Sequence, residues 1–240
     1  MSTKVVIFGA AGSTGRCLVV AGLRQGHEVT AFVRDIGKLR IIFNEAVLSR
    51  IRVCEGDALD EWAVGWAMSG QNAAVNAAAH LTVPDIFEGI CRNIVRQAER
   101  NLEPPRRLWL FGGLPGLDVP HTKTIGSDLP GMSPILRSHK ANYERLKAST
   151  LDWSFMCPGP MTFEPERYFG ARLRVTTEVM PYSIAPWTKW LPRLFHPFIM
   201  LRHLNEASAS YEDVAELVMD NLEANGPYSY RRVGVGPPQD

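Results

Sequence analysis

Cysteine is scarce in this chain of 240 residues, and no two cysteines lie close together. The four are Cys17, Cys54, Cys91 and Cys157. No CxxC pair and no zinc-type spacing occurs, so the sequence predicts neither a disulfide framework nor a metal centre. Isolated reduced thiols are typical of a cytosolic protein, and we expect a cytoplasmic location.

An excess of charge of either sign is also lacking. The chain has 26 Lys and Arg against 25 Asp and Glu, a net charge of +1. A chain so balanced has no overall field to hold nucleic acid or an anionic membrane, and we expect neither as a partner.

Long hydrophobic runs are missing as well. The first run stops at Gly9, and the apolar stretch over 180–204 contains four prolines and three basic residues. Neither approaches the ~20 apolar residues of a spanning helix. No internal repeat is present either.

The sequence does contain a regular alternation of two patterns. Short apolar runs bounded by Gly or Pro predict strands over 4–8, 28–33, 51–54, 73–78, 107–111, 153–156 and 232–235. Helical patterns lie between them, over 16–25, 36–48, 58–69, 84–101, 136–149 and 211–224. This alternation indicates βαβ units, and therefore an α/β fold with a Rossmann-like, doubly wound parallel sheet.

We expect a single domain over residues 1–240, because no linker divides the chain. Two irregular stretches, about 112–134 and 160–209, interrupt the alternation, and we expect them to form a small aromatic-rich substrate lobe. Its aromatic residues are Phe163, Tyr168, Phe169, Tyr182, Trp187, Trp190, Phe195 and Phe198.

Three glycines follow the first predicted strand. In Gly9-Ala10-Ala11-Gly12-Ser13-Thr14-Gly15, Gly9 would permit a tight turn, Gly12 would let a pyrophosphate approach the backbone, and Gly15 would let the helix lie against the strand. The following helix would offer its free N–H groups to the same anion. The pattern therefore predicts a dinucleotide site, although a plain strand-to-helix turn is the alternative.

The second predicted strand ends at Arg34, where an NAD-binding protein usually has an acidic residue. Arg16 follows the third glycine and Lys38 is close by, so two guanidinium groups would flank a 2′-phosphate. This favours NADP(H). Asp35 leaves NAD(H) open, since its carboxylate could either pair with Arg34 or take the ribose. Asp57 could line the adenine or cap the next helix.

The first segment, VVIFGAAGSTGRCLVVAGLRQGHEVTAFVRD, resembles the opening of atypical short-chain dehydrogenases, closest to the NmrA-like and biliverdin reductase B/flavin reductase-like branch. Four later segments also match this branch: EGDALD, LWLFGG, LKASTLDWSFMCPGPMTFEPERY and SYEDVAELVMDNLE. The resemblance covers nearly all of the chain except about 115–135 and 172–208.

The resemblance implies a Rossmann fold with NADPH lying across the carboxyl edge of the sheet. It further implies three groups of contact residues. Gly9, Ala11, Gly12, Ser13, Thr14, Gly15, Arg16 and Arg34 would hold the phosphates, and Asp57 and Ala58 would touch the adenine. Ala77, Ala78, Ala79 and Gly112 would lie beside the ribose and nicotinamide, with Pro158 and Gly159 closing the nicotinamide side.

The expected proton donor is difficult to find. Typical short-chain dehydrogenases use a Tyr followed four residues later by a Lys. Tyr143 and Lys147 have this spacing, but aligning on LKASTLDW puts the family's Tyr near Ile135 and its Lys near His139. We therefore keep His139 and the Tyr143/Lys147 pair as catalytic candidates. His80 and His121 are further candidates.

The sequence thus predicts an NADPH-dependent oxidoreductase that transfers hydride to a small planar carbonyl, quinone or flavin-like substrate. A delocalised acceptor needs little side-chain acid, so a missing Tyr fits it. The lobe aromatics would either form an apolar wall over the nicotinamide or pack in a core or dimer surface. Two alternatives are a dinucleotide-sensing regulator and a non-redox isomerase or cyclase. A monomer and a homodimer are both open.

Overall fold

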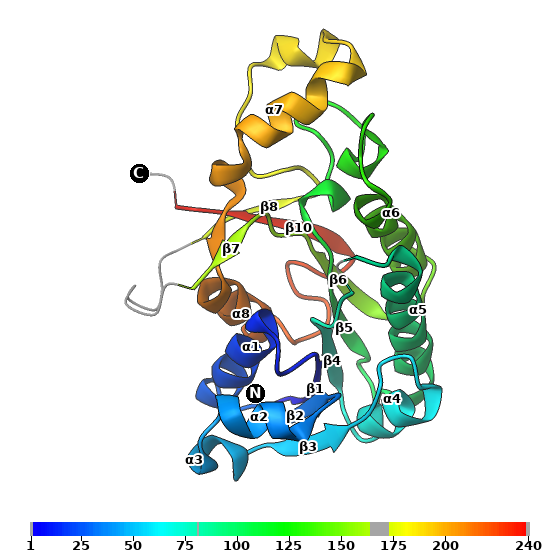
Figure 1. Cartoon of the computed structure of the whole chain (residues 1–240), viewed down its shortest axis with the longest axis vertical. Helices are drawn as coiled ribbons and strands as arrows, with labels where there is room; N and C mark the ends of the chain where they lie inside the picture. Colours follow the sequence, from blue (N-terminus) through cyan, green and yellow to red (C-terminus); the bar gives the residue numbers. More distant parts are fainter. Residues whose placement is uncertain (1, 81, 164–172, 239–240) are drawn as a thin grey trace.

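A parallel sheet forms the centre of the molecule, as the computed structural model shows for residues 2–80, 82–163 and 173–238 (Figure 1). In this part of the chain the strand order is β3-β2-β1-β4-β5-β6-β10-β8, the doubly wound order that was predicted, extended by two strands. The strands are β1 Lys4–Phe8, β2 Glu28–Val33, β3 Arg52–Glu55, β4 Ala73–Asn76, β5 Arg107–Phe111, β6 Asp152–Met156, β8 Arg174–Thr177 and β10 Arg231–Gly236. All pair in parallel except β8, which is antiparallel to β10.

Helices cover both faces of the sheet (Figure 1). On one face lie α1 Ser13–Arg24, α2 Ile36–Ile42, α3 Glu45–Leu48 and α8 Tyr211–Met219, and on the other α4 Glu61–Met68, α5 Pro84–Asn101 and α6 Pro134–Lys147. Successive residues of β1 point to opposite faces, so Val6 and Phe8 enter one core while Val5 and Ile7 enter the other. This double burial explains why β1 is apolar throughout.

Within the irregular stretches, most of residues 112–134 and 178–207 lies at one end of the molecule, beyond β8 and β10 (Figure 1). They contain η1 Leu114–Gly116, η2 Gly126–Asp128, η3 Pro186–Trp190, η4 Arg193–Phe195, α7 His196–Arg202 and η5 Leu204–Ala207, while β7 Met161–Thr162 pairs with β9 Ala209–Ser210. That these stretches form a substrate lobe stays a prediction.

Buried Arg232 connects this end to the sheet. Its guanidinium donates to both carboxylate oxygens of Asp118, at 2.9 and 3.0 Å, and to Glu178 at 2.7 Å. It also donates to the Gly116 carbonyl at 3.2 Å. One side chain of β10 therefore fixes both the loop after β5 and the turn that follows β8.

Several predicted element boundaries were wrong. The helix expected over 36–48 is two helices, because Phe43 leaves the helical region and Asn44 caps α3 by accepting the Val47 N–H. The helix expected from 58 begins at Glu61, since Asp60 is its N-cap. The helix expected to reach 224 ends at Met219.

Candidate functional site

A cleft of about 710 Å³ opens where β1, β2 and β4 end, which is the size of a typical small-molecule site. Its lining is Gly9, Ala11, Gly12, Phe32, Val33, Arg34, Asp35, Lys38, Asp57, Ala58, Leu59, Ala77, Ala78, Ala79, His80, Ile86 and Ile90. Most of these residues come from the carboxyl ends of parallel strands and the loops after them, while Lys38 comes from α2 and Ile86 and Ile90 come from α5. Ligands of doubly wound folds bind at this edge, where the strand order reverses.

The glycine loop is as tight as the sequence predicts. Gly9 has a φ of +76°, and a Cβ there would lie 2.8 Å from the Ala78 nitrogen. A Cβ on Gly15 would lie 2.1 Å from the Gly9 carbonyl oxygen, well inside van der Waals contact. Only glycine at these positions lets the loop, the strand and the first helix approach so closely.

The first turn of α1 faces this loop without a side-chain cap. Gly12 is the N-cap residue, and no acidic residue lies in the first turn. The backbone N–H groups at this end are therefore available to an anion, and the helix dipole favours negative charge there. Ser13, Thr14 and Gly15 open the helix, and none of the three is part of the cleft lining, so their contact with a phosphate stays a prediction.

Three charged side chains lie at the end of β2, and all of them are exposed and line the cleft. Asp35 accepts the Lys38 N–H at 3.3 Å as the N-cap of α2. No ion pair holds Arg34 within residues 2–80, 82–163 and 173–238, so the pairing of Arg34 with Asp35 that the sequence left open is not formed. Arg34 and Lys38 remain free to contact a phosphate.

Arg16 differs from its predicted arrangement. Its guanidinium lies over the Phe163 ring, 4.1 Å from the centroid, and Arg16 is not part of the cleft lining. A cation held over an aromatic face is already stabilised there. Arg34 and Lys38 line the cleft at the end of β2, and the contact of Arg16 with a phosphate stays a prediction.

The floor of the cleft follows β4. Ala77 donates its N–H to the Phe8 carbonyl at 3.0 Å, and the buried Asn76 side chain accepts the Ala78 N–H at 3.0 Å. Asn76, which sequence reasoning missed, thus sets the path of the Ala77–Ala79 segment. A buried amide at the end of an otherwise apolar strand is the signal that could have revealed it.

Asp57 and Ala58 lie in the loop after β3 and line the cleft. Asp57 accepts the Leu59 N–H at 2.8 Å in a turn and does not cap α4, because Asp60 takes that role. The N-cap alternative for Asp57 was therefore wrong.

Three residues predicted near the nicotinamide lie farther along the same edge, outside the cleft lining. The Gly112 N–H donates to the Met156 carbonyl at 2.8 Å, and the Leu114 N–H to the Pro158 carbonyl at 2.8 Å. A Cβ on Gly159 would lie 2.4 Å from the Ala207 carbonyl oxygen. These positions hold the loops after β5 and β6 together, and their contact with a nicotinamide stays a prediction.

His139, the first catalytic candidate, is buried on α6 and does not line the cleft. Its ring packs edge-on against Phe87, with centroids 5.6 Å apart, and lies close to Gly113. Its Nδ1 has no hydrogen-bond partner among the described residues. Burial lowers the pKa of His139 to about 4, so the ring is neutral near pH 7 and cannot serve there as a charged acid.

Tyr143 and Lys147 also lie outside the cleft lining. Tyr143 packs against Phe155 and Trp153 at centroid distances of 6.2 and 5.9 Å, and the Arg232 guanidinium lies 4.8 Å from its ring. Burial raises the pKa of Tyr143, the opposite of what a catalytic phenol needs. Lys147 is exposed, 4.0 Å from Glu144.

Of the remaining histidine candidates, His80 lines the cleft and His121 does not. His80 Nδ1 accepts the Val83 N–H at 3.2 Å, which leaves Nε2 as the protonated nitrogen of the neutral ring. His121 is exposed and contacts the Ile184 carbonyl. Ile86 and Ile90, one turn apart on α5, add an apolar wall to the cleft.

The lobe aromatics do not share one environment. Tyr182 is buried and stacks on His203 with centroids 5.2 Å apart, whereas Trp187, Trp190, Phe195 and Phe198 are exposed. None of these five lines the cleft, so a wall over the nicotinamide stays a prediction. Tyr168 and Phe169 lie outside the described residues.

Comparison with known proteins assigns the family. Residues 9–184 match the NAD(P)H-binding family, and the chain belongs to it. The expected likeness to atypical short-chain dehydrogenases is confirmed at the level of this NAD(P)H-binding family. No curated protein matches the sequence.

Solved structures share the fold over nearly the whole chain. A Bacteroides thetaiotaomicron protein provisionally named an epimerase is 21% identical, with a TM-score of 0.76 and coverage of 100% of this chain and 99% of the other. A Streptococcus pneumoniae protein provisionally named an NADH-flavin reductase is 19% identical, with a TM-score of 0.70 and coverage of 99% and 100%. A short-chain dehydrogenase/reductase from Veillonella parvula, in complex with NADP, is 19% identical, with a TM-score of 0.67 and coverage of 99% and 96%.

Among the described residues there is neither a candidate membrane span nor a candidate metal site. None of their helices is long and apolar enough to cross a bilayer. No group of three or more His, Cys, Asp or Glu side chains among them could hold a metal ion.

Proposed function

We propose that the chain is an NADPH-dependent oxidoreductase that transfers hydride to a small planar carbonyl, quinone or flavin-like acceptor. The observation that carries the proposal is the cradle formed by Gly9, Gly12 and Gly15 against the uncapped start of α1. A side chain at Gly15 would overlap the Gly9 carbonyl oxygen and push the loop away from α1. Bare backbone N–H groups beside a glycine-lined cleft suit a pyrophosphate, and the family is an NAD(P)H-binding one.

The preference for the phosphorylated cofactor rests on Arg34 and Lys38. Both line the cleft at the end of β2, where an acidic residue would accept the ribose hydroxyls of NAD. Asp35 stands next to Arg34, but its carboxylate caps α2. A 2′-phosphate would thus meet two cations at the position where the ribose lies.

Each part of the chain has a defined task in this proposal. The loop after β1 and the start of α1 hold the diphosphate, and Asp57 and Ala58 flank the adenine. Ala77, Ala78 and Ala79 support the nicotinamide ribose, with Gly112, Pro158 and Gly159 on the nicotinamide side. The bound dinucleotide supplies the hydride.

Proton supply is the step in which this chain departs from the usual short-chain dehydrogenase. His139, Tyr143 and Lys147 lie outside the cleft lining, whereas His80 lies in it. The neutral His80 ring can donate a hydrogen bond from Nε2 to a substrate oxygen. A delocalised acceptor stabilises its own negative charge and takes a proton from water, so positioning supplies most of the rate.

The test is a comparison of two cofactors on the purified protein. NADPH and NADH are titrated while nicotinamide fluorescence is followed, first with the unaltered chain and then with Arg34→Ala. We expect tighter binding of NADPH, and a loss of about tenfold for NADPH against little change for NADH, the worth of one charge-assisted hydrogen bond. Equal losses for both cofactors would show that Arg34 does not contact the 2′-phosphate.

A dinucleotide-sensing regulator is the second candidate, because the three predicted catalytic side chains lie outside the cleft. A panel of quinones and flavins, assayed with NADPH at 340 nm, separates the two functions. Steady turnover supports the enzyme, while binding of NADPH without turnover of any acceptor supports the regulator. Product formation without a change at 340 nm would indicate a non-redox isomerase.

A further inference from the structure

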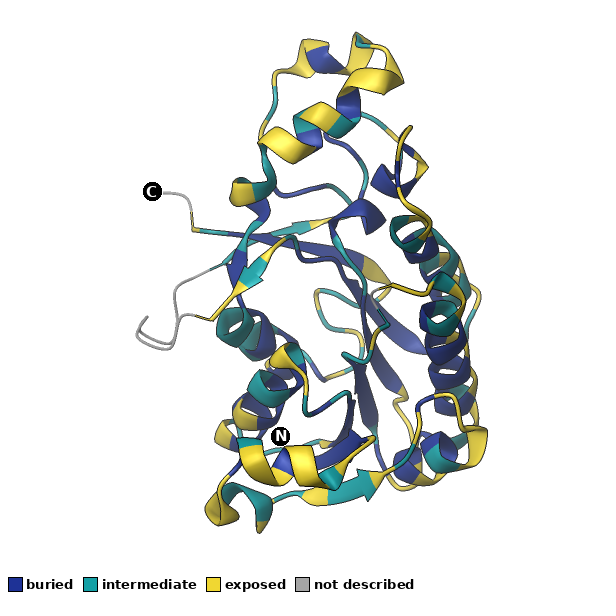
Figure 2. Ribbon diagram, in the orientation of Figure 1, coloured by how far each residue is buried: buried dark blue, intermediate teal, exposed yellow. Residues whose placement is uncertain are grey.

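Exposed residues predominate at the end of the molecule formed by η3, η4 and α7 (Figure 2). We call residues 186–202 the aromatic apex. Its exposed large apolar residues are Trp187, Trp190, Leu194, Phe195, Phe198 and Leu201. Trp190 is 76% exposed, and Phe198 is 67% exposed. So much exposed apolar surface in one short segment indicates an interaction surface that a partner or a membrane covers when the protein functions.

The local helices direct these side chains outward together. A 3₁₀-helix has three residues per turn, so Trp187 and Trp190 lie one above the other on η3. On α7, Phe198 and Leu201 share one side, while His196 and Met200 are buried on the other. The buried side fixes α7 to the molecule, which leaves the aromatic side unpaired.

The charge of the apex has a single sign. The sequence has no Asp or Glu from residue 179 to residue 205, whereas Lys189, Arg193 and Arg202 are present and exposed. The Lys189 ammonium lies 4.7 Å from the Trp190 ring centroid. Aromatic and cationic groups are therefore interleaved over the same few residues.

The acidic residues next to the apex are already paired. Asp128, whose backbone carbonyl accepts from Arg193, binds Lys140 through its carboxylate at 2.6 Å. Glu206 lies 2.6 Å from the His203 ring. The cations of the apex are thus not neutralised by these neighbours, although the whole chain carries a net charge of only +1.

We propose that the aromatic apex binds the surface of an anionic lipid bilayer, with its indole and phenyl rings in the headgroup region and its cations on the lipid phosphates. Tryptophan, leucine and basic residues together are the composition of interfacial binding segments. Each cation near an anionic surface adds roughly fivefold to the affinity. The expectation that the chain has no membrane partner rested on its net charge and on the lack of long hydrophobic runs. Both are properties of the whole chain, and neither describes the charge and hydrophobicity of one local surface.

A second copy of the chain fits the apex less well. A two-fold interface sets the same patch against itself, so Lys189, Arg193 and Arg202 of one copy would face the same set of cations on the other. Like charges brought together in this way oppose association. An anionic bilayer instead complements all three.

The test is co-sedimentation of the full chain with vesicles of phosphatidylcholine, with or without phosphatidylglycerol. We expect binding to the anionic vesicles, little to the neutral ones, and weaker binding as salt rises and the charges are screened. Lys189→Glu with Arg202→Glu should lower the affinity for anionic vesicles by roughly tenfold or more.

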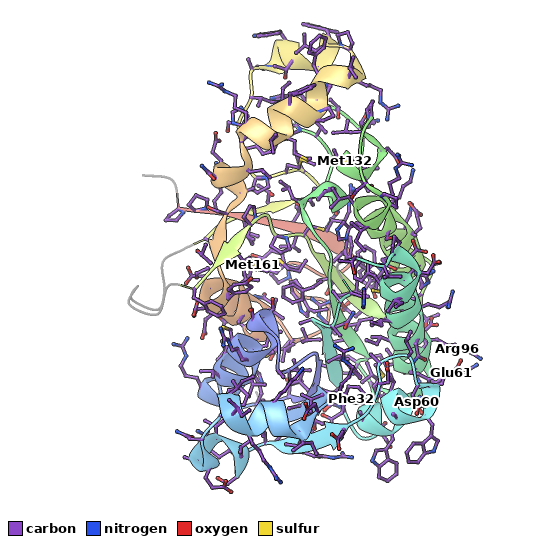
Figure 3. All side chains as sticks on the ribbon, in the orientation of Figure 1. Phe32, Asp60, Glu61, Arg96, Met132 and Met161 are labelled. Atoms are coloured by element: carbon purple, nitrogen blue, oxygen red, sulfur yellow. The ribbon has the colours of Figure 1, made fainter. Side chains whose placement is uncertain are left out.

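A matched pair of tryptophans provides the control. Trp62 and Trp66 on α4 are 74% and 58% exposed and stack with centroids 5.9 Å apart. Figure 3 shows their neighbours Asp60 and Glu61 at the end of the molecule opposite to α7. Trp187→Ser with Trp190→Ser should reduce vesicle binding at least tenfold, whereas Trp62→Ser with Trp66→Ser should leave it unchanged.

Two results would overturn the proposal. One is equal binding of the unaltered chain and the apex variant to anionic vesicles, which includes no binding by either. The other is a dimer in solution that Trp187→Ser with Trp190→Ser converts to a monomer, because the apex would then be a contact between copies. Neither result bears on the cofactor, since NADPH titration of the same variants tests the cleft separately.

Discussion

At the scale of single residues, the cofactor cleft depends on the absence of a side chain. Gly15 sits where a Cβ would overlap the Gly9 carbonyl oxygen. The loop could accommodate the extra atom only by moving away from α1. The same movement would disperse the N–H groups that are proposed to hold the diphosphate.

We therefore expect Gly15→Ala to abolish NADPH binding and to lower the unfolding temperature. Gly226→Ala is the control, because a Cβ there meets only the Glu223 carbonyl oxygen, at an ordinary 3.4 Å. Fluorescence titration and thermal unfolding measure both effects. Normal NADPH binding by Gly15→Ala would contradict the cradle.

His139 gives a prediction about pH. Its pKa is lowered to about 4 in the folded protein by burial, while the unfolded chain titrates near 6.5. Between these values the unfolded state binds more protons, so stability falls as pH falls from 6.5 to 4. At pH 4, the titration of His139 has lowered the free energy of unfolding by about 3 kcal/mol relative to its value above pH 6.5.

The measurement is urea unfolding at a series of pH values for the unaltered chain and for His139→Gln. We expect the free energies of unfolding to diverge in their pH dependence below pH 6.5, with the flatter curve belonging to the variant. Parallel curves down to pH 4 would show that His139 is accessible to protons in the folded state.

The sequence predicted the residues that line the cofactor cleft better than it predicted the positions of Arg16 and the catalytic candidate His139. The tight glycine loop after β1 and the place of Arg34 after β2 were predictable, because local spacing along the chain determines both. Arg16 was not, since its position over Phe163 depends on a segment far along the chain. The burial of His139 against Phe87 likewise depends on how α6 packs on α5, which no local pattern encodes.

At the scale of elements, the predicted strands were those with a strong burial signal. Runs such as Val5–Phe8 are apolar at every position because both faces of the sheet are covered. The edge strand β8 was missed, because Arg174–Thr177 is only partly buried and has no apolar alternation. Its place is set by pairing with β10, a long-range contact.

The attachment of β8 and the loop after β5 to the sheet depends on Arg232. We expect Arg232→Met to reduce the free energy of unfolding by about 3 kcal/mol, because Asp118 and Glu178 would keep their charges without a partner. Adding Asp118→Asn to this variant should recover part of the loss. Urea unfolding of the two variants measures it, and a loss below about 1 kcal/mol for Arg232→Met would contradict the role of this cluster.

At the scale of the whole molecule, cofactor binding and folding are coupled. The cleft is built from β1, β2, β4 and the loops that follow them, so the site forms only in the folded chain. NADPH at a hundred times its dissociation constant should stabilise the protein by about 2.7 kcal/mol. For a chain of this size we expect a rise in unfolding temperature of roughly 5–10 °C.

Differential scanning fluorimetry with NADPH and NADH at equal concentration checks this prediction. The larger rise should come from NADPH, and Arg34→Ala should remove the difference between the cofactors. An unfolding temperature that neither dinucleotide changes would contradict cofactor binding in this cleft.

The place of β10 in the sheet bears on the order in which the chain can fold during synthesis. Residues 231–236 lie between β6 and β8, although β8 is made well before them. A nascent chain that has reached β8 therefore holds a strand whose sheet neighbour has not yet left the ribosome, while β6 offers an open edge. Until residue 236 emerges, that edge can recruit strands from other nascent chains, so chaperone demand during translation should peak in this interval.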